Sequence, residues 1–286
     1  SYKLVYAIGE RYFYDKSFYR KSITYGYTEQ NKDLTVFGKR AKDIILLRNI
    51  TDKGAHVLGI QDDPHIFTIA IIGDSYVWGQ GIKNENRFAT LLEQKLNAIK
   101  RTKIYSFSLP RDNFIDHYEK IKIMQPIMHI DLYIYFLVFN DILMIKDTKY
   151  FPETSKEIKK ECEKYGPFAY DYVENDWNQY IKNIVRALQT ESNRCIARYF
   201  FQSLPQNTIV FEPDYIFDND PQLHNMYLSF DGLQNFRRVS SHDYLYLFPG
   251  PVTNSEKFWN VWHVSNKEGH PSTVTNIFLL MLYLKK

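Results

Sequence analysis

The 286-residue sequence is poor in cysteine, with only Cys162 and Cys195. This pair shows no CxxC or Cys/His spacing, so the sequence indicates neither a metal site nor a disulfide framework, although one disulfide stays open. No apolar run approaches the roughly 20 residues that a membrane-spanning helix needs, and no signal-peptide pattern opens the chain. Because the first residue is Ser1 rather than methionine, a removed signal or anchor and an extracytoplasmic location stay open, and the location itself is unknown.

The sequence also lacks a large excess of positive or negative charge. The chain has 36 Lys and Arg against 33 Asp and Glu, spread along its length. Nucleic acids bind proteins through concentrated positive charge, so nucleic acid is not an expected partner. The eight histidines show no HExxH or comparable spacing, and we expect no metal and no organic cofactor.

The sequence does contain short apolar runs that alternate with longer amphipathic segments. This alternation is typical of βαβ units and predicts a three-layer α/β/α fold with a doubly wound, mostly parallel, five-stranded sheet. Strands are expected at residues 67–72, 103–107, 132–138, 208–211 and 244–248. Helices are expected at residues 87–99, 114–124, 178–201 and 276–284.

The alternation also divides the chain. It is absent from residues 1–66, which we interpret as an N-terminal extension packed on the core, and it runs through residues 67–286, which form the main domain. Residues 144–177 are predicted to form an inserted helical segment. Its charge-rich stretch at 155–164 is expected to face solvent.

The first candidate motif is Gly73-Asp74-Ser75, which follows an apolar strand directly. In doubly wound sheets ligands bind at the carboxyl ends of strands, so Ser75 lies where a reacting group is expected. Taken alone, the three residues favour an ordinary turn that caps a helix. A phosphate-binding loop fits poorly, because a third glycine would fall on Asn84 and no Gly-Lys-Ser/Thr follows.

Two later segments carry further candidates. Asn140 follows the strand at 132–138, and its amide can donate to an oxyanion or, with Asp141, cap a turn. His270 precedes Pro271, which disfavours helical geometry at His270 and predicts a loop there. Glu268 is the nearest carboxylate and can orient the imidazole, although a single loop histidine is more often a surface residue.

Taken together and in this order, the three segments resemble the SGNH (GDSL-like) hydrolase superfamily. Residues 73–82, Gly-Asp-Ser-Tyr-Val-Trp-Gly-Gln-Gly-Ile, are similar to its GDSxTxGxGV block, and residues 268–272, Glu-Gly-His-Pro-Ser, are similar to its Asp-Gly-His-Pro-Asn/Ser block. The resemblance spans residues 67–286. It implies that Ser75 is the nucleophile, that Asn140 donates to the oxyanion, and that His270 is the base.

Three positions need separate comment. Arg111 stands where the second block of the superfamily has glycine; its amide can still complete the oxyanion hole, but a surface position is the favoured interpretation. Glu268 replaces the usual aspartate as the third triad member. Trp78 is a candidate wall of the acyl or sugar pocket, with core packing as the alternative.

The resemblance implies an ester hydrolase that forms an acyl-enzyme intermediate on O-acyl (acetyl-type) esters of carbohydrate or lipid, without a cofactor. One alternative is an O-acyltransferase that uses the same Ser/His site on a polysaccharide acceptor. Another is a catalytically silent binding domain. The oligomeric state is not predicted.

Overall fold

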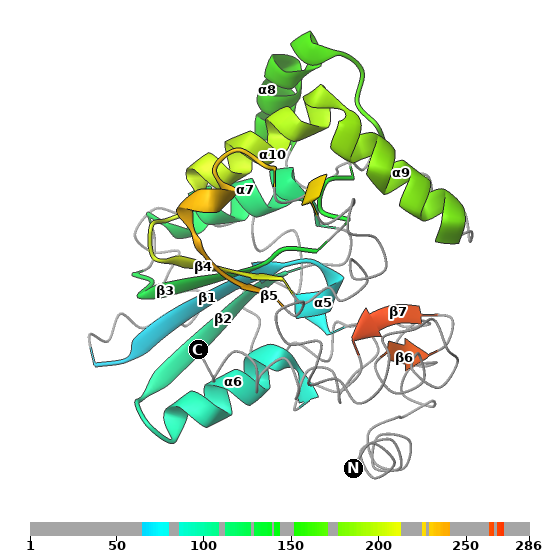
Figure 1. Cartoon of the computed structure of the whole chain (residues 1–286). Coiled ribbons are helices and arrows are strands. Elements are labelled where there is room, and N and C mark those ends of the chain that lie inside the picture. Colours follow the sequence, from blue (N-terminus) through cyan, green and yellow to red (C-terminus); the bar gives the residue numbers. More distant parts are fainter. Residues whose placement is uncertain are drawn as a thin grey trace.

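The structure is a computed structural model of the chain (Figure 1). It describes residues 65–79, 86–108, 112–126, 129–138, 140–143, 152–170, 177–212, 225–226, 229–240, 263–265 and 268–271. The expected N-terminal extension at residues 1–66, apart from its last two residues, and the expected helix at 276–284 lie outside the described residues.

Five parallel strands form the central sheet, which confirms the predicted fold class. They are β1 (Phe67–Gly73), β2 (Thr102–Ser108), β3 (Leu132–Phe136), β4 (Thr208–Glu212) and β5 (Arg237–Ser240). Their spatial order is β2-β1-β3-β4-β5. The direction of winding therefore reverses between β1 and β3, and doubly wound sheets bind ligands at the carboxyl ends of the strands at such a reversal.

Helices cover both faces of the sheet (Figure 1). One face carries α6 (Phe88–Asn97), and the other carries α7 (Phe114–Met124), α8 (Pro152–Cys162), α9 (Trp177–Gln189) and α10 (Glu191–Ser203). The described residues also include two short 3-10 helices, η4 (Glu163–Tyr165) and η6 (Leu233–Asn235). None of the helices in the described part of the chain combines the length and hydrophobicity that a membrane crossing requires.

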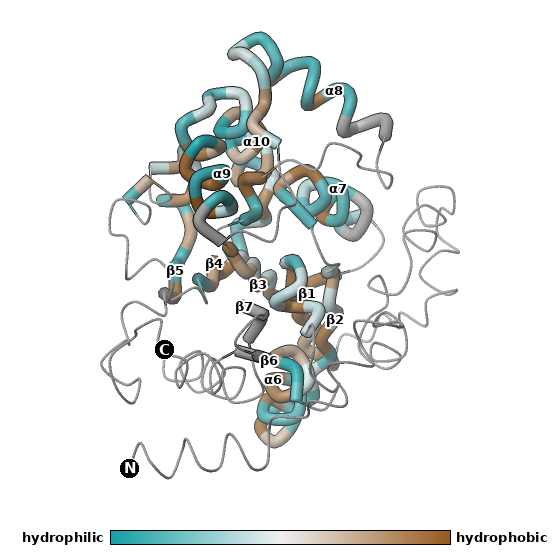
Figure 2. The backbone as a smooth tube through the Cα atoms, turned by 90° about the vertical axis from the view of Figure 1, so that its right-hand side faces the viewer, coloured by the Kyte–Doolittle hydropathy of each residue, from teal (hydrophilic) through white to brown (hydrophobic). Residues whose placement is uncertain are grey.

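Alternate residues of each central strand enter the two cores. In β3, Tyr133 and Tyr135 pack in the core that includes α7 and α10, whereas Ile134 and Phe136 pack in the core that includes α6. Both faces of such a strand are buried, which is why its sequence is apolar without interruption. Figure 2 shows this hydrophobic centre, with α8 largely hydrophilic on the outside. Each fully buried large apolar side chain contributes about 1.5–3 kcal/mol.

Local signals account for one helix in full. The predicted helix at 114–124 is confirmed as α7 with the same bounds. Asn113 begins it as N-cap, its side chain accepting a hydrogen bond from the Ile115 amide at 2.9 Å, while the Asp116 carboxylate accepts one from the Asn113 amide at 3.1 Å. Such reciprocal capping satisfies donors that the first helical turn leaves without partners.

Two helix predictions were wrong in their extent. The single helix expected at 178–201 is two helices that meet at Thr190, whose backbone is extended and whose hydroxyl donates to the Arg186 carbonyl at 2.7 Å. The helix expected at 87–99 ends at Asn97. The Asn97 side chain pairs there with the backbone of Thr102 at the start of β2, and Ile99 is left 84% exposed.

The fifth strand of the sheet is Arg237–Ser240, which the sequence analysis did not predict, and the strand expected at 244–248 lies outside the described residues. β5 pairs only with β4 among the described strands, and a strand at a sheet edge needs no continuous apolar run. Its Arg238 instead forms an ion pair with Glu212 of β4, at 2.6 Å from Nε to Oε1. Periodicity therefore gave no signal for it.

The cysteines form the one disulfide that the sequence left open. Cys162 at the end of α8 is bonded to Cys195 of α10, with the Cα atoms 5.6 Å apart. The helical character expected within 144–177 is confirmed by α8, and the bond ties this segment to the main core. Closing a loop of 33 residues stabilises a fold by about 3–4 kcal/mol in the chain-entropy description.

Candidate active site

Ser75 lies at the carboxyl end of β1, where it begins the short helix α5 (Ser75–Trp78). Asp74 is the N-cap of this helix, and its Oδ1 accepts a hydrogen bond from the Tyr76 amide at 2.9 Å. The Gly-Asp-Ser turn is therefore a helix cap, as its residue types favour. It also places Ser75 beside the reversal point of the sheet, because β3 is the next strand.

The two glycines that flank this turn have steric reasons to be glycine. A Cβ at Gly73 would lie 2.5 Å from Val77 Cγ2 and 3.1 Å from Phe136 Cβ. Gly79 ends α5 with a φ of 77°, in the left-handed region that side chains disfavour. Gly73 is thus required by the tight packing of α5 on the sheet, and Gly79 by the left-handed backbone at the end of α5.

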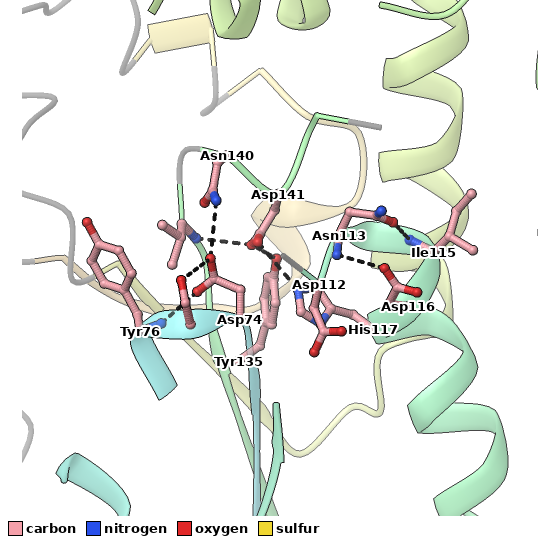
Figure 3. A network of polar contacts seen from close by, with 12 residues as sticks. Asp74, Tyr76, Asp112, Asn113, Ile115, Asp116, His117, Tyr135, Asn140 and Asp141 are labelled. Atoms are coloured by element: carbon pink, nitrogen blue, oxygen red, sulfur yellow. Dashed lines mark hydrogen bonds and ion pairs between the residues drawn. The ribbon is translucent and has the colours of Figure 1, made fainter. Parts of the chain in front are cut away.

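The structure brings Ser75 and Asn140 together. The Ser75 hydroxyl donates to Asp74 Oδ2 at 3.2 Å, and Asn140 Nδ2 donates to the same oxygen at 3.2 Å (Figure 3). Asn140 is 66 residues from Asp74 in sequence and reaches the site from the end of β3. Its side chain therefore points toward Asp74, the residue before the serine, rather than capping its own turn.

The segment that contains Glu268 and His270 also lies at this site. It is strand β7 (Glu268–Pro271), paired antiparallel with β6 (His263–Ser265). Cα atoms of β7 lie within 8 Å of Cα atoms of α5 (Figure 1). The expected loop at His270 was wrong, because extended strand geometry satisfies the restriction that Pro271 places on the preceding residue equally well. The roles of Glu268 and His270 stay predictions.

The structure assigns no functional role to two other predicted residues, Arg111 and Trp78. Arg111 lies outside the described residues. Trp78 is only 3% exposed, and this burial favours the core-packing alternative, while a pocket role stays a prediction. Among the described residues, His, Cys, Asp and Glu side chains form no group of three that could hold a metal ion.

A buried polar network next to the site was missed by the sequence analysis (Figure 3). Its centre is Asp141, which is fully buried. Asp141 Oδ2 accepts hydrogen bonds from the Tyr135 hydroxyl and from the Val138 amide, the latter at 3.1 Å. Asp141 Oδ1 lies 3.4 Å from Nε2 of His117, which is also fully buried.

A signal for this network was present in the sequence. His117 follows Phe114 by three residues and precedes Ile121 by four, so it lies on the apolar face of α7. A histidine on such a face needs a buried partner. The sequence does not reveal that the partner is Asp141, since the two residues meet only through the packing of α7 on the end of β3.

Burial controls the charge of this network. It raises the pKa of Asp141 to about 8, against the opposing effect of the hydrogen bonds from Tyr135 and Val138, and it lowers the pKa of His117 to about 4. Burial also raises the pKa of Asp112 to about 7, although Lys120 forms an ion pair with it. Between pH 4 and 8 the His117–Asp141 pair is therefore largely uncharged.

Stability is expected to fall as pH rises from 7 to 8.5. Asp141 keeps its proton in the folded state up to about pH 8, whereas an unfolded aspartate loses it near pH 4. The folded state thus binds more protons, and its stability decreases as pH rises through the folded pKa. The loss from this group over this range is about 1 kcal/mol, measured by urea unfolding at each pH.

The matched variants are Asp141→Asn and Asp231→Asn, the second at an exposed carboxyl on the surface. Asp141→Asn is expected to flatten the pH dependence of stability above pH 7.5. Above that pH the contribution of Asp112, whose pKa is about 7, decreases. Asp231→Asn is expected to leave it unchanged. An unchanged slope in Asp141→Asn would contradict the raised pKa.

No protein-family model matches the sequence, and no curated protein is similar to it in sequence. Three solved structures resemble the chain, each at 11% identity: TesA, a lipase/acylhydrolase from Enterococcus faecalis, and a member of the lipolytic protein G-D-S-L family from Veillonella parvula. Their TM-scores are 0.45, 0.46 and 0.40. The matches cover 76%, 77% and 77% of this chain and 96%, 94% and 97% of those chains.

Proposed function

We propose that this chain is a serine ester hydrolase of the SGNH (GDSL-like) type, with Ser75 as its nucleophile. The observation that carries the proposal is the meeting of the Ser75 hydroxyl and the Asn140 amide on one oxygen of Asp74, each at 3.2 Å. A nucleophile and a hydrogen-bond donor at the reversal point of a doubly wound sheet suit acyl transfer, in which attack on a carbonyl creates an oxyanion.

The reaction begins when the Ser75 hydroxyl turns from Asp74 to His270. His270 accepts the hydroxyl proton as Oγ bonds to the ester carbonyl carbon, and Glu268 orients the imidazole. The carbonyl oxygen becomes an oxyanion that accepts hydrogen bonds from Asn140 Nδ2 and from the amides of Ser75 and Arg111.

Collapse of this tetrahedral intermediate releases the first product. The bond to the alcohol breaks, the alcohol takes the proton from His270, and the acyl group stays on Ser75. Water, deprotonated by His270, then attacks the acyl carbon, and the carboxylic acid leaves as the proton returns to Ser75. The substrates that we propose are small O-acyl esters, of the acetyl type, on carbohydrate or lipid.

The proposal is tested by trapping the nucleophile. An aryl dialkyl phosphate forms a stable adduct with an activated serine, and mass spectrometry of the digested protein locates it. We expect one adduct per chain on Ser75, formed more slowly when a short-chain nitrophenyl ester competes. A chain that neither forms this adduct nor turns over short-chain and long-chain nitrophenyl esters is not a serine hydrolase. Acyl groups diverted to an added oligosaccharide would identify the acyltransferase instead.

A further inference from the structure

The side-chain amide of Asn140 makes few hydrogen bonds that would fix its orientation. Its Nδ2 donates to Asp74, and its Oδ1 has no hydrogen-bond partner among the described residues. One bond allows the amide to rotate. A fixed direction for Nδ2 must therefore come from the backbone that carries the side chain, which is the turn at residues 140–143, named here the Asn140 turn.

This turn is anchored from inside by hydrogen bonds of its own. The Leu143 amide donates to the Asn140 carbonyl at 2.9 Å, and the Asp141 amide donates to the Val138 carbonyl at 3.1 Å. The Asp141 side chain then folds back, so that its Oδ2 accepts from the Val138 amide. These bonds fix the backbone on both sides of Asn140.

Three neighbouring elements hold the Asn140 turn from outside. The Tyr135 hydroxyl of β3 donates to Asp141 Oδ2, and His117 Nε2 of α7 lies 3.4 Å from Asp141 Oδ1. The Phe114 amide, at the start of α7, donates to the Asp141 carbonyl at 3.3 Å. On the far side, Asn193 of α10 donates to the Ile142 carbonyl at 2.9 Å and is itself fully buried.

Most of these contacts converge on Asp141, the residue next to Asn140. A buried, multiply bonded carboxyl group cannot move without exposing polar atoms to an apolar core, which costs several kcal/mol in general. The backbone of Asn140, the preceding residue, is therefore restricted as well. Preorganised donors stabilise an oxyanion because they need no reorientation during the reaction.

We propose that Asp141, held by Tyr135 and His117, is a positioning residue that fixes the direction of the Asn140 amide toward Asp74 Oδ2, the oxygen that also accepts the Ser75 hydroxyl. The inference rests on the proposed function for its catalytic consequence, but the orientation of the amide can be measured without any activity. Asp141 touches neither Ser75 nor a reacting atom in this arrangement; it acts through Asn140.

The kinetic experiment compares Asp141→Ala, Asn140→Ala and the double variant with a short-chain nitrophenyl ester. Asn140→Ala is expected to lower kcat by about 10²- to 10³-fold, and Asp141→Ala, which removes the contacts to Tyr135, Val138 and His117, by about 10- to 100-fold with KM within about twofold. If Asp141 acts through Asn140, the double variant is no slower than Asn140→Ala alone. Multiplied losses in the double variant would overturn the proposal.

Tyr135→Phe is the milder second variant, in case Asp141→Ala fails to fold. It removes only the hydroxyl that donates to Asp141 and is expected to lower kcat by about 3- to 10-fold. Tyr133→Phe is its matched control, because Tyr133 lies on the same strand and in the same core, two residues farther from the site. Equal losses in the two tyrosine variants would also overturn the proposal.

The orientation of the amide is read separately from the side-chain amide signal of Asn140 in a proton–nitrogen NMR spectrum, assigned through its absence in Asn140→Ala. We expect this signal to shift in Tyr135→Phe and Asp141→Ala but not in Tyr133→Phe. The signal could shift as expected although the intact chain neither turns over esters nor forms the adduct on Ser75. That result would support the positioning role of Asp141 and contradict the proposed function. If the signal does not shift in the Tyr135 and Asp141 variants, positioning fails even in an active enzyme.

Discussion

Replacing Ser75 by alanine is expected to lower kcat for short-chain nitrophenyl esters by about 10⁴- to 10⁶-fold, the loss that follows removal of a serine nucleophile. The Ser75 hydroxyl donates to Asp74 Oδ2, the oxygen that Asn140 Nδ2 also contacts. The remaining slow turnover would reflect hydrogen bonding to the oxyanion and substrate binding alone. The measurement is the initial rate at saturating ester, with thermal unfolding recorded to show that the fold is intact.

Ser203→Ala is the matched control for this loss. Ser203 ends α10, and its hydroxyl donates to the Phe200 carbonyl at 2.7 Å, remote from the carboxyl end of β1. Its removal is expected to leave kcat within about twofold, as for most changes away from a site. Ser75→Ala with more than a tenth of the intact rate would exclude Ser75 as the nucleophile.

Replacing His270 by alanine is expected to lower kcat by a similar factor, about 10⁴-fold or more, because an unassisted serine hydroxyl is a weak nucleophile near neutral pH. The structural basis is the position of β7 beside α5, the helix that Ser75 begins. Part of the rate is expected to return with added imidazole, which supplies a base without restoring the side chain. The measurement is the ester turnover rate with and without imidazole.

His263 provides a control on the same strand pair, since it lies on β6 and pairs with Pro271 of β7. His263→Ala makes the same change in the same hairpin and is expected to keep most of the activity. Equal losses in the two variants would mean that the hairpin matters only for folding. Glu268→Gln is expected to lower kcat by about 10²-fold or more if the carboxylate orients His270, and full activity would remove Glu268 from the triad.

The sequence by itself determined the features that depend on neighbouring residues. Short apolar runs predicted β1 to β4, because strands that are buried on both faces are rich in apolar residues. Asn113 and Asp116 cap α7 within one turn, so its predicted bounds were right. The Gly-Asp-Ser block predicted a turn at the end of a strand, and its glycines are needed there by close packing. Three motifs in order were also enough to predict a superfamily and a nucleophile.

Only the tertiary structure decided which distant residues meet. It placed Asn140 on Asp74, β7 beside α5, Cys162 on Cys195, and His117 on Asp141. It also selected Arg237–Ser240 as the strand that pairs with β4 and divided the helix expected at 178–201 at Thr190. These outcomes depend on contacts between segments tens of residues apart, where the gain from burying and pairing side chains outweighs the local preference of any one segment. The periodicity of apolar residues along the chain does not indicate which distant residues meet. The buried network that holds Asn140 could therefore be found only in the folded molecule.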